Sequence, residues 1–202
     1  MPTSADRTQR GVPAKCASCN HPMDSPLFCD HCRSLHPAQG LNYFELLGLE
    51  PSFEIDPVLL RQRYLRISRG VHPDHHGGDD SSASQRLSAQ LNEAHRVLTD
   101  PVLRAGYLLE MAGGKSATDD KSVSQDVLTA TLMLREEIAE AKESDDASAL
   151  EACAAQVRVR HEAALREITE LAGELPGDEA LRHRLRSALN AMKYYQKLQT
   201  EL

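Results

Sequence analysis

Residues 57–76 read PVLLRQRYLRISRGVHPDHH, and this stretch decides the fold. Its first proline suits the first turn of a helix and the aspartate before it is a good N-cap, so the pattern predicts a helix over 57–69. The glycine that follows favours the end of that helix. Pro73 restricts its own φ and favours an extended backbone at His72. The sequence therefore predicts that His72-Pro73-Asp74 forms a polar corner outside the helix.

Two flanking stretches and a basic helix face make this pattern specific. A short helical motif, YFELLGL, precedes it at 43–49, and LNEAHRVLTDP follows it at 91–101. Between them Arg63, Arg66 and Arg69 are spaced three residues apart, so their side chains share one broad helix face. The His-Pro-Asp tripeptide alone would be weak evidence for a particular fold or function. Its place between these two motifs and after a basic helix makes the pattern specific.

This order resembles the J-domain family. The matching positions are Tyr43-Phe44, Leu47-Gly48-Leu49, Tyr64-Leu65, the His-Pro-Asp triplet, residues 92–98 and Asp100-Pro101. The resemblance implies that the polar corner and the basic helix bind an Hsp70-type chaperone and stimulate its ATPase. The implied contact residues are His72, Pro73, Asp74, Arg63, Arg66 and Arg69. The ATP chemistry would belong to the Hsp70 partner, and this chain is expected not to be an enzyme.

Two other interpretations of the triplet stay open at the level of the residues. His72, His75 and His76 could belong to an ordinary polar loop, or they could bind a metal in a metal-dependent hydrolase. The hydrolase interpretation lacks acidic side chains at helical spacing that would complete a ligand set. Turnover in the absence of any Hsp70 would favour it.

Residues 16–39, called the cysteine module below, contain two CxxC motifs and little apolar content. A segment this small cannot fold by hydrophobic burial alone. The two motifs, separated by nine residues, can place four thiolates tetrahedrally around a zinc ion. The predicted ligands are Cys16, Cys19, Cys29 and Cys32. Because four thiolates leave no open coordination position, we expect one structural zinc per chain.

Several alternatives remain for the cysteine module. The four thiols could be free, the site could hold iron instead of zinc, and a nearby histidine could replace one cysteine. The candidate histidines are His21, His31 and His36. A redox role for a single CxxC is less favoured, because no alternating strand and helix pattern surrounds either motif. The module could order the N-terminus, mediate a homodimer or respond to redox state.

The rest of the pattern predicts an all-α chain with two helical parts behind the cysteine module. Apolar residues recur every three or four positions over 124–143, 146–173 and 177–202, and the short connections predict an antiparallel three-helix bundle. The expected domains are a disordered lead at 1–15, the cysteine module at 16–39, a J-domain with a helical hairpin at 41–112, a linker at 113–123 and the bundle at 124–202.

Some apolar residues of the predicted bundle fall outside its inward stripes. The inward stripe of the first bundle helix is Val127, Thr131, Leu134, Ile138 and Ala141. Leu128, Leu132 and Met133 point sideways or away from it, next to glutamates, and Tyr194 faces outward on the last helix. Exposed apolar groups beside carboxylates are typical of a partner-binding face, although isolated outward hydrophobes are common.

The arrangement over residues 41–202 resembles the HscB-type co-chaperones of iron–sulfur cluster assembly. LREE at 134–137 and MKYYQKL at 192–198 carry the resemblance, together with the order of J-domain, linker and bundle. It implies that the bundle binds an iron–sulfur cluster scaffold protein and delivers it to a dedicated Hsp70. The implied scaffold contacts are Leu128, Leu132, Glu136, Glu140 and Tyr194, whereas Thr129 and Met133 depart from the family pattern. The cysteine module, with Phe28 beside Cys29, resembles that of the zinc-bearing subset of this family.

Composition opposes other function classes. The 202 residues carry a net charge of −7, which opposes a general affinity for nucleic acid or an anionic membrane, and with it a zinc-dependent nucleic-acid-binding protein. No apolar run approaches the roughly 20 residues that span a bilayer, and the N-terminus lacks the apolar core of a secretory signal. We therefore expect the cytoplasm of a bacterium or the mitochondrial matrix of a eukaryote. A J-domain co-chaperone for a different client is the second functional hypothesis.

Overall fold

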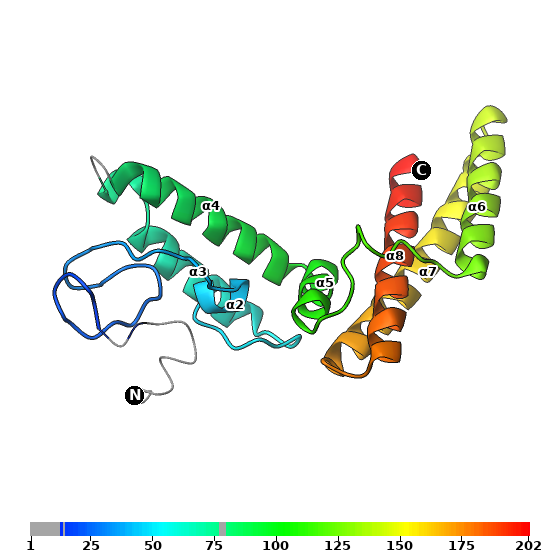
Figure 1. Cartoon of the computed structure of the whole chain (residues 1–202). Helices are drawn as coiled ribbons and strands as arrows, with labels where there is room; N and C mark the ends of the chain where they lie inside the picture. The colour runs from blue at the N-terminus through cyan, green and yellow to red at the C-terminus, as the bar shows by residue number, and fades with distance from the viewer. Residues whose placement is uncertain (1–12, 14, 77–79) are drawn as a thin grey trace. The chain divides into compact units, whose positions relative to one another are not determined.

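Figure 1 shows the computed structural model of the chain, in which Pro13, residues 15–76 and residues 80–202 are described. The expected disordered lead at 1–15 lies almost wholly outside the described residues. Helices dominate the described ranges, where the β pairing consists of isolated bridges within residues 15–35. The prediction of an all-α fold is confirmed.

The first of two compact units, Met1–Pro101, contains the expected helical hairpin. Its elements are α2 (Tyr43–Leu46), α3 (Pro57–Gly70), the 3-10 turn η1 (Pro73–His75) and α4 (Asp80–Thr99). α4 packs against both α2 and α3, with Leu60 and Leu91 among the buried side chains. The Tyr64 hydroxyl of α3 also donates a hydrogen bond to Asn92 Oδ1 of α4 at 2.9 Å.

Capping residues set the starts of α2 and α3. Asn42 Oδ1 accepts a hydrogen bond from the Glu45 amide at 3.0 Å, and the Glu45 carboxylate accepts one from the Asn42 amide at 2.8 Å. This reciprocal pair is a capping box. Asp56 accepts a hydrogen bond from the Val58 amide at 2.8 Å, so the predicted N-cap of α3 is confirmed.

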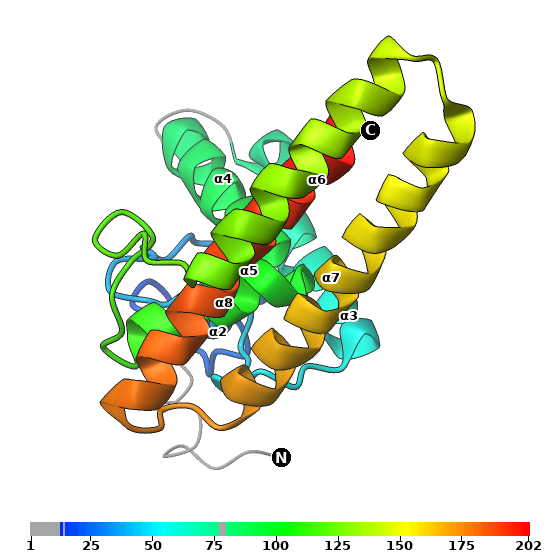
Figure 2. The ribbon, with the colours of Figure 1, turned by 90° about the vertical axis from the view of Figure 1, so that its right-hand side faces the viewer.

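The second unit, Val102–Leu202, holds the three-helix bundle. Its elements are α5, which spans Pro101–Met111, followed by α6 (Gln125–Glu143), α7 (Ala147–Gly173) and α8 (Glu179–Glu201). Figure 2 shows α6, α7 and α8 packed along one another, each pair in contact, so the predicted bundle is confirmed. The contacts of α5 place it in this unit; the J-domain boundary at residue 112 stays a prediction.

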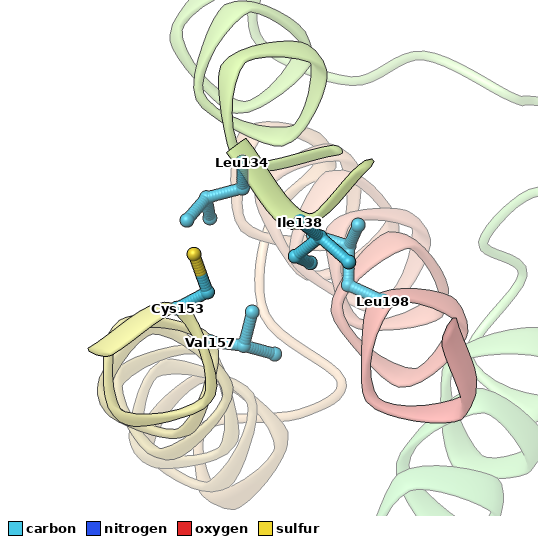
Figure 3. Close-up of a cluster of buried hydrophobic side chains, with 5 residues drawn as sticks. All are labelled: Leu134, Ile138, Cys153, Val157 and Leu198. Carbon is cyan, nitrogen blue, oxygen red and sulfur yellow. The ribbon is translucent and has the colours of Figure 1, made fainter. Parts of the chain in front are cut away.

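Side chains from all three bundle helices meet in a buried core (Figure 3). The cluster consists of Leu134 and Ile138 from α6, Cys153 and Val157 from α7, and Leu198 from α8. Burial is the main cause that raises the pKa of the Cys153 thiol. Cys153 is therefore a small buried packing residue.

α8 also holds the linker between α5 and α6. The buried Arg186 donates from Nε to the carbonyl oxygen of Lys115 at 2.9 Å. The buried Asn190 donates from Nδ2 to the carbonyl oxygens of Asp120 and Ser122 at 2.9 and 3.0 Å. The polar composition of this segment predicts a linker but not its attachment, because the partners lie far along the chain.

Candidate functional site

Four sulfur atoms converge in the cysteine module. The Sγ atoms of Cys16, Cys19, Cys29 and Cys32 all lie within 4.8 Å of one another. Cys16 Sγ lies 3.6 Å from Cys32 Sγ, and Cys19 Sγ lies 3.7 Å from Cys29 Sγ. Thiolates bound tetrahedrally to one zinc ion at about 2.3 Å would lie about 3.8 Å apart. The structure therefore brings the predicted ligand set together in an arrangement that fits a tetrahedral metal ion.

The two CxxC motifs repeat one backbone geometry. The Asn20 amide donates to the carbonyl oxygen of Cys16 at 2.9 Å, and the Arg33 amide donates to that of Cys29 at 2.9 Å. Asn20 and Arg33 have φ angles of 60° and 65°, in the left-handed region, and close equivalent turns. Each turn directs its two sulfurs toward the shared centre.

Ser34 supports the cluster. Its hydroxyl lies 3.2 Å from Cys16 Sγ and 3.1 Å from Cys32 Sγ. Hydrogen bonding by this hydroxyl is the main cause that lowers the pKa of both thiols, that of Cys16 to about 4. A lowered pKa favours the thiolate form, which is the form that binds a metal. No feature of the sequence singled out Ser34 for this role.

The histidines of the module lie outside the sulfur cluster. Among the described residues, the group arranged to hold a metal ion consists of the four cysteines and includes no histidine. His21 and His31 instead stack on each other, with ring centroids 4.2 Å apart. The geometry favours the all-cysteine ligand set over one in which a histidine replaces a cysteine.

His72-Pro73-Asp74 forms an exposed corner directly after α3. His72 has an extended backbone, with φ −63° and ψ 134°, as the following proline predicts. The side chains of His72 and Asp74 are 52% and 84% exposed. The histidines here form no metal-binding group within the described ranges. His76 is buried, with Nε2 2.8 Å from the carbonyl oxygen of Gly70.

The arginines of α3 do not form a uniform free surface. Arg66 Nη2 donates to Asp30 Oδ2 of the cysteine module at 2.9 Å. Arg69 is exposed and Arg63 is half-buried. The sequence predicted the basic face, but it did not predict that an acidic residue between two cysteines of the sulfur cluster binds to it.

The predicted scaffold-binding residues, called the bundle face below, lie on α6 and α8. Leu128, Leu132 and Tyr194 are 38%, 58% and 36% exposed. Glu136 and Glu140 are exposed as well. The outward orientation that helical periodicity predicted is confirmed for these side chains, and their role in binding stays a prediction.

Comparison with known proteins agrees with this geometry. Residues 42–107 match the DnaJ domain, and residues 123–202 match the HSCB C-terminal oligomerisation domain. A co-chaperone protein HscB homolog of Shewanella halifaxensis is 32% identical over 168 residues, which cover 80% of this chain and 95% of the relative. The chain belongs to the HscB family of J-domain co-chaperones.

Other HscB proteins extend the likeness. The iron-sulfur cluster co-chaperone protein HscB of Mus musculus is 30% identical over 161 residues, covering 75% of this chain and 67% of the relative. The crystal structure of human co-chaperone protein HscB shares the fold, with a TM-score of 0.72 at 23% identity over 92% of this chain and 95% of that one.

Within the described residues no helix has the length and apolar character to cross a membrane.

Proposed function

We propose that this chain stimulates the ATPase of an Hsp70-type chaperone through the polar corner and delivers an iron–sulfur cluster scaffold protein to it through the bundle face. One observation carries the proposal: a single HscB-family chain combines an exposed His72-Pro73-Asp74 corner with an exposed apolar and acidic face on α6 and α8. The name of the mouse relative, an iron-sulfur cluster co-chaperone, supplies the class of client.

The corner is suited to binding a partner and not to chemistry of its own. It presents an imidazole, a rigid proline and a carboxylate in a fixed order, beside a basic helix. Positive side chains on α3, including Arg63 and Arg69, would attract an acidic surface of the chaperone and orient it. ATP hydrolysis would take place in the Hsp70, so the chain acts as an activator and not as an enzyme.

The bundle face has the composition expected of a protein interface. Leu132 and Tyr194 are large exposed hydrophobic side chains, and such groups anchor an interface when a partner buries them. Glu136 and Glu140 would form a charged rim that fixes the orientation of a basic partner. A scaffold protein bound here would be presented to the Hsp70 that docks at the corner.

The proposed metal is zinc, one ion per chain, with a structural role. The four thiolates would fill its tetrahedral shell and leave no position for a substrate. Iron is the alternative for an all-cysteine site, and elemental analysis of the purified chain distinguishes the two. Finding neither metal, with the thiols freely reactive in the native protein, would reject the site.

Single-turnover ATP hydrolysis by a purified Hsp70-type chaperone tests the proposed function. We expect the chain to stimulate hydrolysis, and an iron–sulfur scaffold protein to increase that stimulation further. If an unfolded peptide replaces the scaffold equally well, the chain is a J-domain co-chaperone for a different client. If hydrolysis does not respond to the chain, the proposed function is wrong.

The proposed location depends on the source organism. We infer the cytoplasm for a bacterium and the mitochondrial matrix for a eukaryote, since HscB relatives occur in both Shewanella and mouse. Fractionation of cells that carry the native protein, followed by immunodetection, would decide between these compartments.

A further inference from the structure

The ring of Phe28 occupies the space beside Gly70, the last residue of α3. Phe28 is 2% exposed. A Cβ atom at position 70 would lie 2.2 Å from Phe28 Cε1, far closer than nonbonded carbon atoms approach. The cysteine module therefore packs directly on the backbone of α3, two residues before His72, and this contact requires glycine at position 70.

Asp30 makes a second contact with the same helix. Its carboxylate lies 2.9 Å from Arg66 Nη2, and the two side chains are 49% and 46% exposed. A half-exposed ion pair by itself contributes little free energy. We therefore expect the packing of Phe28 to contribute most of the stability of the contact between the cysteine module and α3. The ion pair links one arginine of the proposed Hsp70-docking surface to the cysteine module.

The backbone of Gly70 and Val71, at the end of α3, is also held by two serines of α4 and by His76, the residue after η1. Ser84 and Ser88 of α4 both donate from their hydroxyls to the carbonyl oxygen of Val71. His76 Nε2 lies 2.8 Å from the carbonyl oxygen of Gly70. His72 follows Val71 directly. Contacts that fix the backbone of Gly70 and Val71 therefore also fix the position of the polar corner.

The cysteine module contacts the C-terminal half of α3 through the two residues that flank Cys29. Phe28 and Asp30 are the neighbours of Cys29, whose sulfur belongs to the four-sulfur cluster. A segment of this size rarely folds on hydrophobic burial alone, so a bound metal would supply much of its stability. Metal binding at Cys29 would therefore hold both neighbours in place, and loss of the metal would release them.

We propose that the metal-loaded cysteine module is a positioning element of the Hsp70-docking surface. It seats Phe28 on Gly70 and Asp30 on Arg66, and in this way it fixes the corner that begins at His72. The effect of metal binding on the conformation of the corner, called the internal coupling below, is argued from these contacts alone. Its effect on Hsp70 binding rests on the proposed function. The conformation of the corner and the stimulation of Hsp70 are therefore measured separately.

Backbone amide NMR of the full chain tests the internal coupling. We compare the zinc-loaded protein with the protein after zinc removal by a chelator. The amide signals of Val71, His72 and Asp74 should shift when zinc is removed. In zinc-loaded Phe28→Ala these signals should already be displaced and should respond much less to zinc removal. Signals that do not respond to zinc in the unmodified chain would overturn the proposal.

Gly70→Ala provides a second variant that leaves the module's own residues unchanged. Its new methyl group should displace Phe28 from α3 and shift the same signals while one zinc per chain remains bound. Gly173→Ala is the matched control, because Gly173 ends α7 and a Cβ there meets nothing within 4 Å. In the double variant Phe28→Ala/Gly70→Ala, the second change should add little. If Gly70→Ala leaves the corner signals in place, Phe28 does not position the corner and the proposal fails.

Single-turnover ATP hydrolysis tests the consequence for Hsp70. If Phe28→Ala lowers the docking-competent population to about one tenth, the concentration of chain needed for half-maximal stimulation rises about tenfold. The stimulated rate at saturation should stay near that of the unmodified chain. An unchanged concentration dependence would overturn the positioning role. If the zinc-loaded unmodified chain gives no stimulation, the proposed function itself is wrong, and the NMR comparison alone decides the internal coupling.

Discussion

His72 Nδ1 lies 3.2 Å from the backbone nitrogen of Asp74 and accepts its hydrogen bond, so the imidazole is tied to the corner that carries it. The same Nδ1 also lies 3.5 Å from Asp74 Oδ2, so the imidazole and the carboxylate lie close together on either side of Pro73. The imidazole is half exposed and the carboxylate is more exposed still, so both groups are accessible to a docked partner.

The first prediction concerns His72→Gln. We expect it to abolish stimulation of Hsp70 ATP hydrolysis while the free energy of unfolding changes by less than about 0.5 kcal/mol, because His72 is exposed and outside the core. Single-turnover hydrolysis and thermal unfolding measure the two effects. His75→Gln changes another exposed histidine of the same turn and should retain stimulation. Undiminished stimulation by His72→Gln would reject the corner as the docking element.

The second prediction concerns the basic face of α3. Charge reversal in Arg63→Glu/Arg66→Glu should weaken stimulation, more at about 0.01 M salt than at about 1 M, since the Debye lengths are about 30 and 3 Å. Stimulation as a function of salt concentration measures this. Arg158→Glu/Arg166→Glu makes the same charge change on α7 and should have no comparable effect. A loss that does not depend on salt would point to disrupted packing and not to electrostatic attraction.

The third prediction concerns Ser34 and metal binding. Removing its hydroxyl in Ser34→Ala should raise the pKa of the Cys16 and Cys32 thiols, because this hydrogen bond is the main cause that lowers them. Protons then compete better for the sulfurs, so zinc should be released at a higher pH on acidification. Loss of a residue that supports metal ligands typically weakens metal affinity about 10- to 100-fold. Zinc release followed with a chromogenic chelator measures both effects.

Ser18→Ala serves as the control for Ser34→Ala. Ser18 is exposed, and its backbone amide, not its hydroxyl, contacts Cys16 Sγ. The zinc affinity of Ser18→Ala, and the pH at which this variant releases zinc, should equal those of the unmodified chain. If Ser34→Ala behaves in the same way as Ser18→Ala, the Ser34 hydroxyl has no role in metal binding.

Features set by local sequence were predictable, and those set by distant partners were not. Helix starts follow from caps such as Asp56, and the extended His72 follows from Pro73, because each effect acts on an adjacent residue. The convergence of the four cysteines follows from CxxC spacing. By contrast, the contact of Phe28 with Gly70 and the ion pair of Asp30 with Arg66 join segments about forty residues apart. No periodicity or spacing encodes such pairs.

The fourth prediction concerns Asn190, whose side chain holds the linker on α8. Asn190→Ala leaves the carbonyl oxygens of Asp120 and Ser122 without this donor. The loss should cost about 1–3 kcal/mol of stability, the usual range for a partner removed from a buried polar group. Chemical denaturation of the full chain measures it. Gln196→Ala, at an exposed position of the same helix, should change stability by less than about 0.5 kcal/mol. Equal effects of the two changes would mean that Asn190 does not fix the linker.

The last prediction concerns the bundle face. Leu132 and Tyr194 are 58% and 36% exposed, so truncating both in Leu132→Ala/Tyr194→Ala should change the free energy of unfolding little. Scaffold binding should weaken strongly, because removing a central apolar anchor from an interface costs roughly 2 kcal/mol or more. Stimulation of the Hsp70 by the chain alone should persist, since the corner is unchanged. The additional stimulation by scaffold should disappear.

Calorimetric titration of an iron–sulfur scaffold protein into this double variant decides the matter. Val159→Ala is the control, because Val159 is a 62% exposed hydrophobic residue on α7, outside the bundle face. It should bind scaffold as the unmodified chain does. Unchanged affinity in the double variant would show that Leu132 and Tyr194 are ordinary surface hydrophobes. Loss of the cooperative thermal transition would instead show that they stabilise the bundle, and either result would contradict their assignment as scaffold anchors.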